Sequence, residues 1–208
     1  MDPSLASYVA VALIFLLMGL GVPVFGALAL AGAAGIIMVE DLAFLLARLK
    51  SLSYATTAVY TLTIIPLFIL MGSFAHQAEI GRKLFDVANR WVGHLPGGLA
   101  MASILTSAGF AATSGSSVAT AATVGSVAIP EMKKAGYEPS LSAGAVAAGG
   151  VLGVLIPPSV LLIFYAALTE TSAGKMLIAG FVPGLLTTIV FMLGIFLIAR
   201  KGASRRAV

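Results

Sequence analysis

The chain has 208 residues, of which 60% are apolar and only 10% are charged, and it contains no cysteine. Soluble domains carry about 25% charged residues, so this composition excludes a soluble globular protein and a disordered one, while the lack of cysteine excludes disulfides and thiol chemistry. The 12 Lys and Arg residues are separated by long uncharged runs, so the net charge of +4 does not predict nucleic-acid binding. We therefore expect an all-α integral membrane protein, with one crossing for every ~20 apolar residues.

Residues 1–94 are predicted to form a scaffold part with three membrane spans and interfacial helices. The apolar runs 8–20 and 24–39 flank a short turn that contains glycine and proline, which predicts two antiparallel helices. Leucines at helical spacing over 41–53 are typical of an interfacial helix. A third span is predicted over 55–75.

The longest polar stretch lies between His76 and His94. Within it, apolar residues recur at intervals of three and four, opposite four charged residues. This pattern predicts an amphipathic helix that lies along the membrane surface, with Trp91 at the level of the lipid headgroups. A solvated connecting helix fits the same pattern equally well.

Residues 95–175 are predicted to form a transport part, which begins with a helical hairpin over 97–130. The apolar segment 99–130 is interrupted at its centre by small polar residues, from Thr113 to Ser117. Each half then holds about a dozen residues, or about 20 Å of helix, which is too short for a ~30 Å hydrocarbon core. We therefore predict a hairpin that enters the membrane and returns to the same side; the alternative is one long span that tolerates small polar residues.

The second half of the transport part is predicted to be a broken span over 141–169. Its centre, from Gly149 to Ser159, contains three glycines and two consecutive prolines. Prolines lack a backbone donor and glycines weaken a helix, so we predict a discontinuous span with an unwound centre. Residues 176–208 are predicted to form a last span and a basic tail.

The distribution of basic residues predicts the orientation. With a re-entrant hairpin there are five crossings, which place nine basic residues on one face and three on the other. The positive-inside rule then puts the carboxyl terminus in the cytoplasm and the amino terminus in the periplasm. A full span over 99–130 would divide the same residues eight against four, which is a weaker bias.

The apolar segments contain no internal acid, lysine or arginine. Proton-coupled transporters need titratable groups within the membrane, whereas sodium can be held by carbonyls and hydroxyls that are freed where helices break. Helix amino termini that follow such breaks suit a carboxylate substrate. The alternative interpretation is that serine and glycine only ease helix packing.

Three motifs carry a resemblance to a known family: Ser114 to Ala119 (SGSSVA), Gly125 to Tyr137 (GSVAIPEMKKAGY) and Gly150 to Ser159 (GVLGVLIPPS). Together they resemble the large membrane subunit of the tripartite ATP-independent periplasmic (TRAP) transporters. The resemblance implies a sodium-driven elevator-type importer in the bacterial inner membrane, without enzymatic activity or an organic cofactor. It also implies an organic acid substrate (a C4-dicarboxylate or another carboxylate), a periplasmic substrate-binding protein that delivers it, and a small membrane subunit.

The resemblance also implies site residues. The sodium ligands would be Ser114, Gly115, Ser116 and Ser117 at the hairpin tip, and Gly153, Ile156 and Pro158 in the broken span, largely through carbonyls. The substrate would contact Ser116, Ser117, Pro157 and Ser159. The family's subunit contains two inverted repeats and this chain resembles only the first, so the second sodium site and part of the substrate site are expected in the missing second repeat.

Two other function classes fit parts of the pattern. A passive ion channel is compatible with breaks lined by serine and threonine. An intramembrane serine hydrolase would use a serine such as Ser114 with a histidine in reach, but both histidines flank the predicted surface helix.

Overall fold

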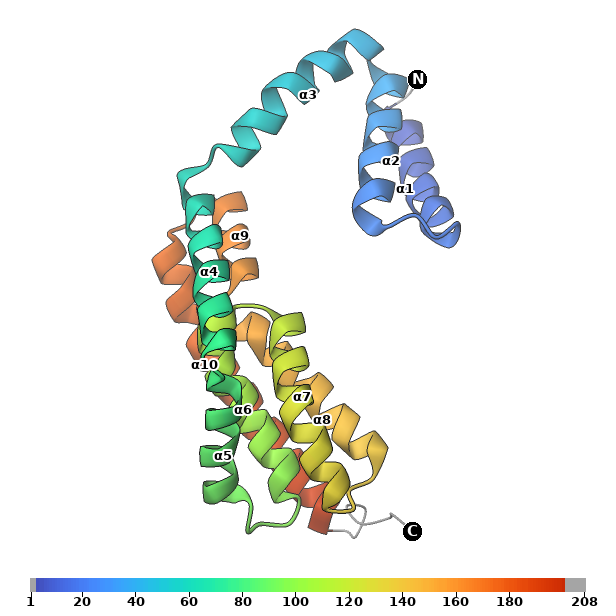
Figure 1. Cartoon of the computed structure of the whole chain (residues 1–208). Helices are drawn as coiled ribbons and strands as arrows, with labels where there is room; N and C mark the ends of the chain where they lie inside the picture. The colour runs from blue at the N-terminus through green and yellow to red at the C-terminus, as the bar shows by residue number, and fades with distance from the viewer. Residues whose placement is uncertain (1–2, 201–208) are drawn as a thin grey trace. The chain divides into compact units, whose positions relative to one another are not determined.

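The computed structural model describes residues 3–200, and in this part of the chain it contains ten α-helices, one 3-10 turn and no strand (Figure 1). The prediction of an all-α membrane protein is confirmed. The helices gather in two compact units, Met1–Val59 and Tyr60–Val208, which are described separately below.

The first unit begins with a pair of apolar helices, α1 (Pro3–Gly19) and α2 (Val24–Val39), which match the first two predicted spans. Gly21 adopts a φ of +83° in the turn between them, a conformation that side chains other than glycine rarely adopt. The two helices meet through small side chains, since Ala27 and Ala31 are fully buried. Most of their large apolar side chains remain exposed, as expected of helices that face lipid.

The third helix, α3 (Leu42–Thr57), begins where Asp41 caps it, because the Asp41 Oδ1 accepts the Phe44 N–H at 2.6 Å. The predicted interfacial segment is therefore helical, but it is longer than predicted. Leu42, Leu46 and Leu49 each leave half or more of their surface exposed, so their apolar stripe is available to a membrane.

The predicted continuous span over 55–75 is wrong at its start. Helix α3 runs on to Thr57, and the second unit opens with a 3-10 turn, η1 (Tyr60–Thr63), followed by α4 (Ile64–Gln77). Pro66 explains the late start, because a proline fits in the first turn of a helix but not in the interior of one that begins at residue 55.

Helix α5 (Ile80–Val92) follows α4 after a bend of 65° and is amphipathic, as predicted. Phe85 and Ala88 on its apolar face are buried in the cluster shared with α6 and α7, so α5 is packed against the hairpin and is not a free connecting helix. Trp91 remains 73% exposed. Its location at the lipid headgroups stays a prediction.

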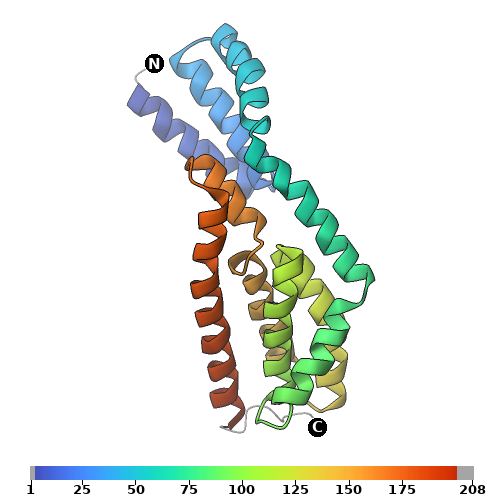
Figure 2. The same cartoon turned by 90° about the vertical axis from the view of Figure 1, so that its left-hand side faces the viewer.

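The predicted helical hairpin is present as α6 (Gly98–Ser114) and α7 (Ser117–Lys134), which lie side by side and run in opposite directions (Figures 1 and 2). One long span over this region is therefore wrong. The arms are longer than predicted, with 17 and 18 residues, or about 26 and 27 Å. For α7 the difference arises because the helix continues through Pro130, so the polar loop after it is only 135–138.

The predicted broken span is present as α8 (Pro139–Leu155) and α9 (Val160–Leu168), with a bend of 40° between them. The break is narrower than predicted, since Gly149, Gly150 and Gly153 all lie inside α8. A Cβ at Gly149 would collide with the Ser107 hydroxyl of α6, and one at Gly150 would lie 2.9 Å from the Ala121 Cβ of α7. These glycines therefore allow α8 to approach the hairpin closely and do not unwind the helix.

Helix α10 (Ala173–Ile198), with 26 residues, is the only described helix that is long and apolar enough to cross a membrane by itself. The pairs α4–α5 and α8–α9 meet the same criteria as bent units, and α1, α2 and α6 are shorter apolar helices. Gly180 and Gly184 of α10 are buried against the break between α8 and α9. Glycines at this spacing are typical of packing surfaces in membrane helices.

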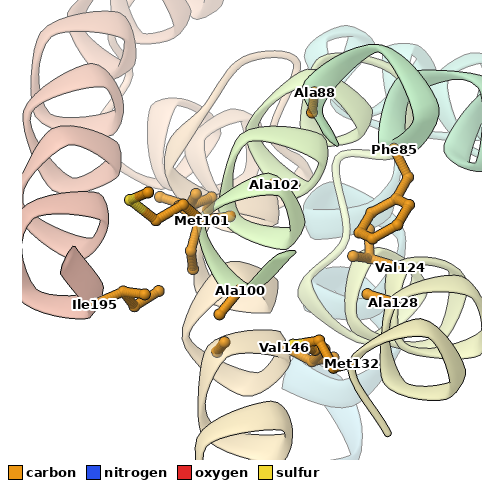
Figure 3. Close-up of a cluster of buried hydrophobic side chains, with 13 residues drawn as sticks. Phe85, Ala88, Ala100, Met101, Ala102, Val124, Ala128, Met132, Val146 and Ile195 are labelled. Atoms are coloured by element: carbon orange, nitrogen blue, oxygen red, sulfur yellow. The ribbon is translucent and has the colours of Figure 1, made fainter. Parts of the chain in front are cut away.

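The core of the second unit includes residues at the base of the hairpin, such as Met101 and Met132 (Figure 3). It combines buried side chains from five helices: Phe85 and Ala88 of α5, Met101 and Ile104 of α6, Val124 and Met132 of α7, Val146 and Leu152 of α8, and Ile195 of α10. At the same end, the Leu99 N–H donates to the Tyr137 hydroxyl at 3.4 Å. The hairpin, the first half of the broken span and α10 therefore share one core.

Candidate ion and substrate site

The hairpin tip consists of two residues with complementary conformations. Gly115 ends α6 in the left-handed region, with a φ of +61°, and its N–H donates to the Ala111 carbonyl. Ser116 is extended and caps α7, because its Oγ accepts the Ala119 N–H at 3.3 Å. The sequence Gly-Ser thus ends one helix and begins the next without an intervening loop.

The break between α8 and α9 is caused by two consecutive prolines, joined by a cis peptide bond. Pro157 and Pro158 have no N–H, so the carbonyls of Gly153 and Val154 lose the donors that a continuous helix would supply. Ser159 then begins α9, since its Oγ accepts the Leu162 N–H at 3.4 Å.

The tip and the break lie against each other. The Val160 N–H at the start of α9 donates to the Gly115 carbonyl at 3.4 Å. A Cβ at Gly115 would lie 2.5 Å from the Pro158 carbonyl oxygen, and one at Gly153 would lie 2.6 Å from the Ser116 carbonyl oxygen. Both glycines are therefore required where the two segments approach each other. The structure brings together the two segments that carry the predicted sodium ligands, while sodium binding itself stays a prediction.

The predicted site residues differ in their accessibility. Ser116 and Ser117 are half-buried at the tip, whereas Ser159 is completely buried as the cap of α9. Pro157 packs toward Gly180 of α10.

Ile156 also faces α10, because its side chain lies 2.7 Å from the position of a Cβ at Gly184. Only its backbone is then free to serve a site at the tip. A role for Pro157 and Ser159 in substrate contact stays a prediction. In the structure Pro157 packs against α10, and Ser159 caps α9.

Four helix ends meet at this junction. The carboxyl ends of α6 and α8 carry partial negative charge, and the amino ends of α7 and α9 carry partial positive charge. A cation and a carboxylate can therefore be stabilised close together without any ionised side chain. Within residues 3–200 no three His, Cys, Asp or Glu side chains gather in a group that could hold a metal ion.

Sequence reasoning missed Thr120, which is fully buried beneath the tip. Its Oγ1 lies 2.8 Å from the Ser114 Oγ and 2.7 Å from the position of a Cβ at Gly153, so it contacts both halves of the site. The signal was available, because Thr120 lies one helical turn after Ser116 and therefore on the same face of α7.

Sequence reasoning also missed the contribution of α4. A Cβ at Gly72 would lie 3.3 Å from the Ser114 Cα, so α4 passes close to the tip. Ser73, His76 and Gln77 continue the same side of α4, and they line a cavity of about 500 Å³ between α4 and the hairpin. A polar stripe with the helical spacing of 72, 73, 76 and 77 in an otherwise apolar helix was the available signal.

Comparisons with known proteins agree with this architecture. A family model described as "Tripartite ATP-independent periplasmic transporter, DctM component" matches residues 11–207. The C4-dicarboxylate TRAP transporter large permease protein DctM of Pseudomonas aeruginosa is 50% identical over 147 residues, which cover 71% of this chain and 34% of that protein. The protein of the same name from Vibrio cholerae is 39% identical over 195 residues, 92% of this chain and 43% of that protein.

Relatives named for other substrates are also similar. The sialic acid TRAP transporter large permease protein SiaM of Vibrio cholerae is 37% identical over 142 residues, 68% of this chain and 33% of that protein. The chain thus spans less than half the length of each of these three relatives.

Proposed function

Because the chain belongs to the DctM component family of the tripartite ATP-independent periplasmic transporters, we propose that it forms the first repeat of the large permease of a sodium-coupled organic acid importer. The permeases of this family are transporters and not enzymes. The proposed substrate class is a C4-dicarboxylate, since the two relatives that are 50% and 39% identical are named for it. Other relatives are named for sialic acid and isethionate, which are also organic acids.

The junction of the hairpin tip with the break supports this function best. In the proposal, sodium is held by Ser114, Gly115, Ser116 and Ser117 together with Gly153, Ile156 and Pro158, largely through carbonyls at the ends of α6 and α8. The substrate carboxylate lies toward the amino end of α7, at Ser116 and Ser117. Pro157 and Ser159, at the break, complete the proposed substrate contacts. Helix ends of both signs at one place suit a cation and an anion that bind together.

The same junction suggests how the two ligands are coupled. The Ser116 carbonyl faces Gly153 on the sodium side, and the Ser116 side chain caps the helix that faces the carboxylate. A sodium ion that orders the tip against the break also orders the donors for the substrate. The coupling free energy is then the difference in substrate binding between the ordered and the loosened tip. Because coupling is reciprocal, bound substrate raises sodium affinity by the same factor.

The proposal extends to the assembly. The protein would lie in the bacterial inner membrane, with a periplasmic amino terminus, a cytoplasmic carboxyl terminus and surrounding lipid. A periplasmic substrate-binding protein would deliver the acid, and a small membrane subunit would support the scaffold. A second repeat with its own sodium site would come from the remainder of the large subunit, in keeping with the share of its relatives that this chain covers.

Uptake of radiolabelled succinate into proteoliposomes that contain the complete transporter tests the proposal. We expect saturable uptake that requires an inward sodium gradient, because the apolar segments contain no internal acid, lysine or arginine for proton coupling. Full uptake in sodium-free buffer under a proton gradient would refute sodium coupling. Non-saturable flux without sodium would indicate a channel, and labelling of Ser114 by a fluorophosphonate would indicate a hydrolase.

A further inference from the structure

The cavity between α4 and the hairpin is a second feature of the tip. Its volume of about 500 Å³ falls within the range of about 300–1,000 Å³ that small-molecule sites occupy. One wall is the polar side of α4, formed by Ser73, His76 and Gln77, and the other is the hairpin, including Ser116 and Thr123. The cavity therefore opens directly beside the residue that caps α7.

The polar groups of this cavity suit an organic anion. The His76 Nδ1 lies 3.1 Å from the Thr123 Oγ1, which anchors the imidazole to α7 through one nitrogen. In the tautomer in which the Thr123 hydroxyl donates to Nδ1, the Nε2–H is left as a donor for a ligand. Gln77 adds an amide donor on the next residue. No acid is among the residues that line the cavity, and Ile69 and Phe110 add an apolar surface. A carboxylate with a short carbon chain matches this combination of donors and apolar wall.

We propose that this cavity holds the transported organic acid, with one acid group, a carboxylate or a sulfonate, bound by the His76 Nε2 and the Gln77 side-chain amide. The proposal rests on the proposed function and adds α4 as a wall of the substrate site. Ser116 belongs to both regions, since its side chain lines the cavity and its carbonyl faces Gly153 at the sodium side. The substrate is thus held between α4 and the tip, next to the ion that orders the tip.

Two substitutions of His76 separate ligand binding from a structural role. The amide of glutamine lies near the position of the imidazole Nε2, and the amide of asparagine lies near that of Nδ1. His76→Gln therefore keeps the ligand-facing donor and loses the contact with Thr123, while His76→Asn does the reverse. If the cavity binds the substrate, His76→Gln retains most of the affinity and His76→Asn loses it.

The experiment measures equilibrium binding of radiolabelled succinate, N-acetylneuraminate and isethionate to the purified complete transporter, with sodium titrated separately. For the acid that the wild type binds, we expect His76→Asn and Gln77→Leu to weaken binding by about tenfold or more. We expect His76→Gln to stay within about threefold of the wild type, and sodium affinity in the absence of acid to stay unchanged in all three variants. His94→Asn, at the other histidine and outside the cavity, is the matched control.

Three results would overturn the proposal: a wild type that binds none of the three acids, unchanged acid affinity in both His76→Asn and Gln77→Leu, or a loss of affinity in His76→Gln but not in His76→Asn. The last result would assign His76 to the contact with Thr123 alone. Failure of the proposed function would give a different result. Acid binding or uptake would then not depend on sodium, while His76→Gln would still bind the acid more tightly than His76→Asn.

Discussion

Gly153→Ala is the substitution that tests the junction most directly. A Cβ at this position would lie 2.6 Å from the Ser116 carbonyl oxygen and 2.7 Å from the Thr120 Oγ1, roughly 0.8 Å closer than the 3.4 Å at which ordinary contact begins. The nearest atom belongs to the backbone, so no side-chain rotation relieves the overlap, and α8 must move away from the tip. Overpacking of this kind destabilises a packed interface by about 1–3 kcal/mol.

If that energy is lost from the ion-binding geometry, sodium affinity falls by roughly 5- to 150-fold. Gly144→Ala on the same helix is the matched control, because a Cβ there meets nothing within 4 Å and alanine favours the helix by up to about 1 kcal/mol. The assay is sodium titration of succinate uptake in proteoliposomes, with thermal unfolding of the purified transporter measured in parallel. Wild-type sodium affinity in Gly153→Ala, or an equal loss in Gly144→Ala, would refute the argument.

Three further predictions concern the proline break, a buried hydroxyl of α6 and the orientation of the chain in the membrane. Pro158→Ala supplies an N–H to the Val154 carbonyl and lets α8 extend, so we expect at least a several-fold loss of sodium affinity in uptake assays, while Ser126→Ala on exposed α7 surface leaves it unchanged. Ser107→Ala removes a buried hydroxyl that has no hydrogen-bond partner, so we expect unfolding in detergent to show a gain in stability of up to about 1 kcal/mol, and a loss would show that the hydroxyl is satisfied in the transporter. A cysteine in place of exposed Ala135 should react with an impermeant thiol reagent only from the cytoplasmic side of vesicles; periplasmic labelling would reverse the predicted orientation.

Much of the fold could be predicted because its determinants are local in the sequence. The turn between α1 and α2 and the tip at Gly115 each depend on residues that act within one helical turn of their own position. The two prolines after Ile156 break the helix through their own missing donors. Signals of this kind need no knowledge of the neighbouring helices.

The features that could not be predicted depend on tertiary contacts. Gly149 and Gly150 looked like helix breakers, but a close neighbour on α6 or α7 makes glycine the residue that fits there. The length of α7 was underestimated because tertiary packing also decides it. Met132, beyond Pro130, is buried in the shared core, and the helix continues to Lys134. The cavity at His76 joins residues 47 positions apart, which no local pattern can bring together.

The arrangement at the tip also explains why the site needs so few polar side chains. In a membrane, a helix end is expensive unless its backbone groups find partners, so a hairpin tip and a broken helix would each be unfavourable alone. Placed together, the ends exchange partners, as when the Val160 N–H donates to the Gly115 carbonyl. The carbonyls of Gly153 and Val154 receive no helical N–H from Pro157 and Pro158, so in the proposed site a monovalent cation would satisfy them without requiring an ionised side chain. If the junction binds sodium as proposed, ion binding and closure of the junction are the same event, and we expect any substitution that separates α8 from the tip to weaken both.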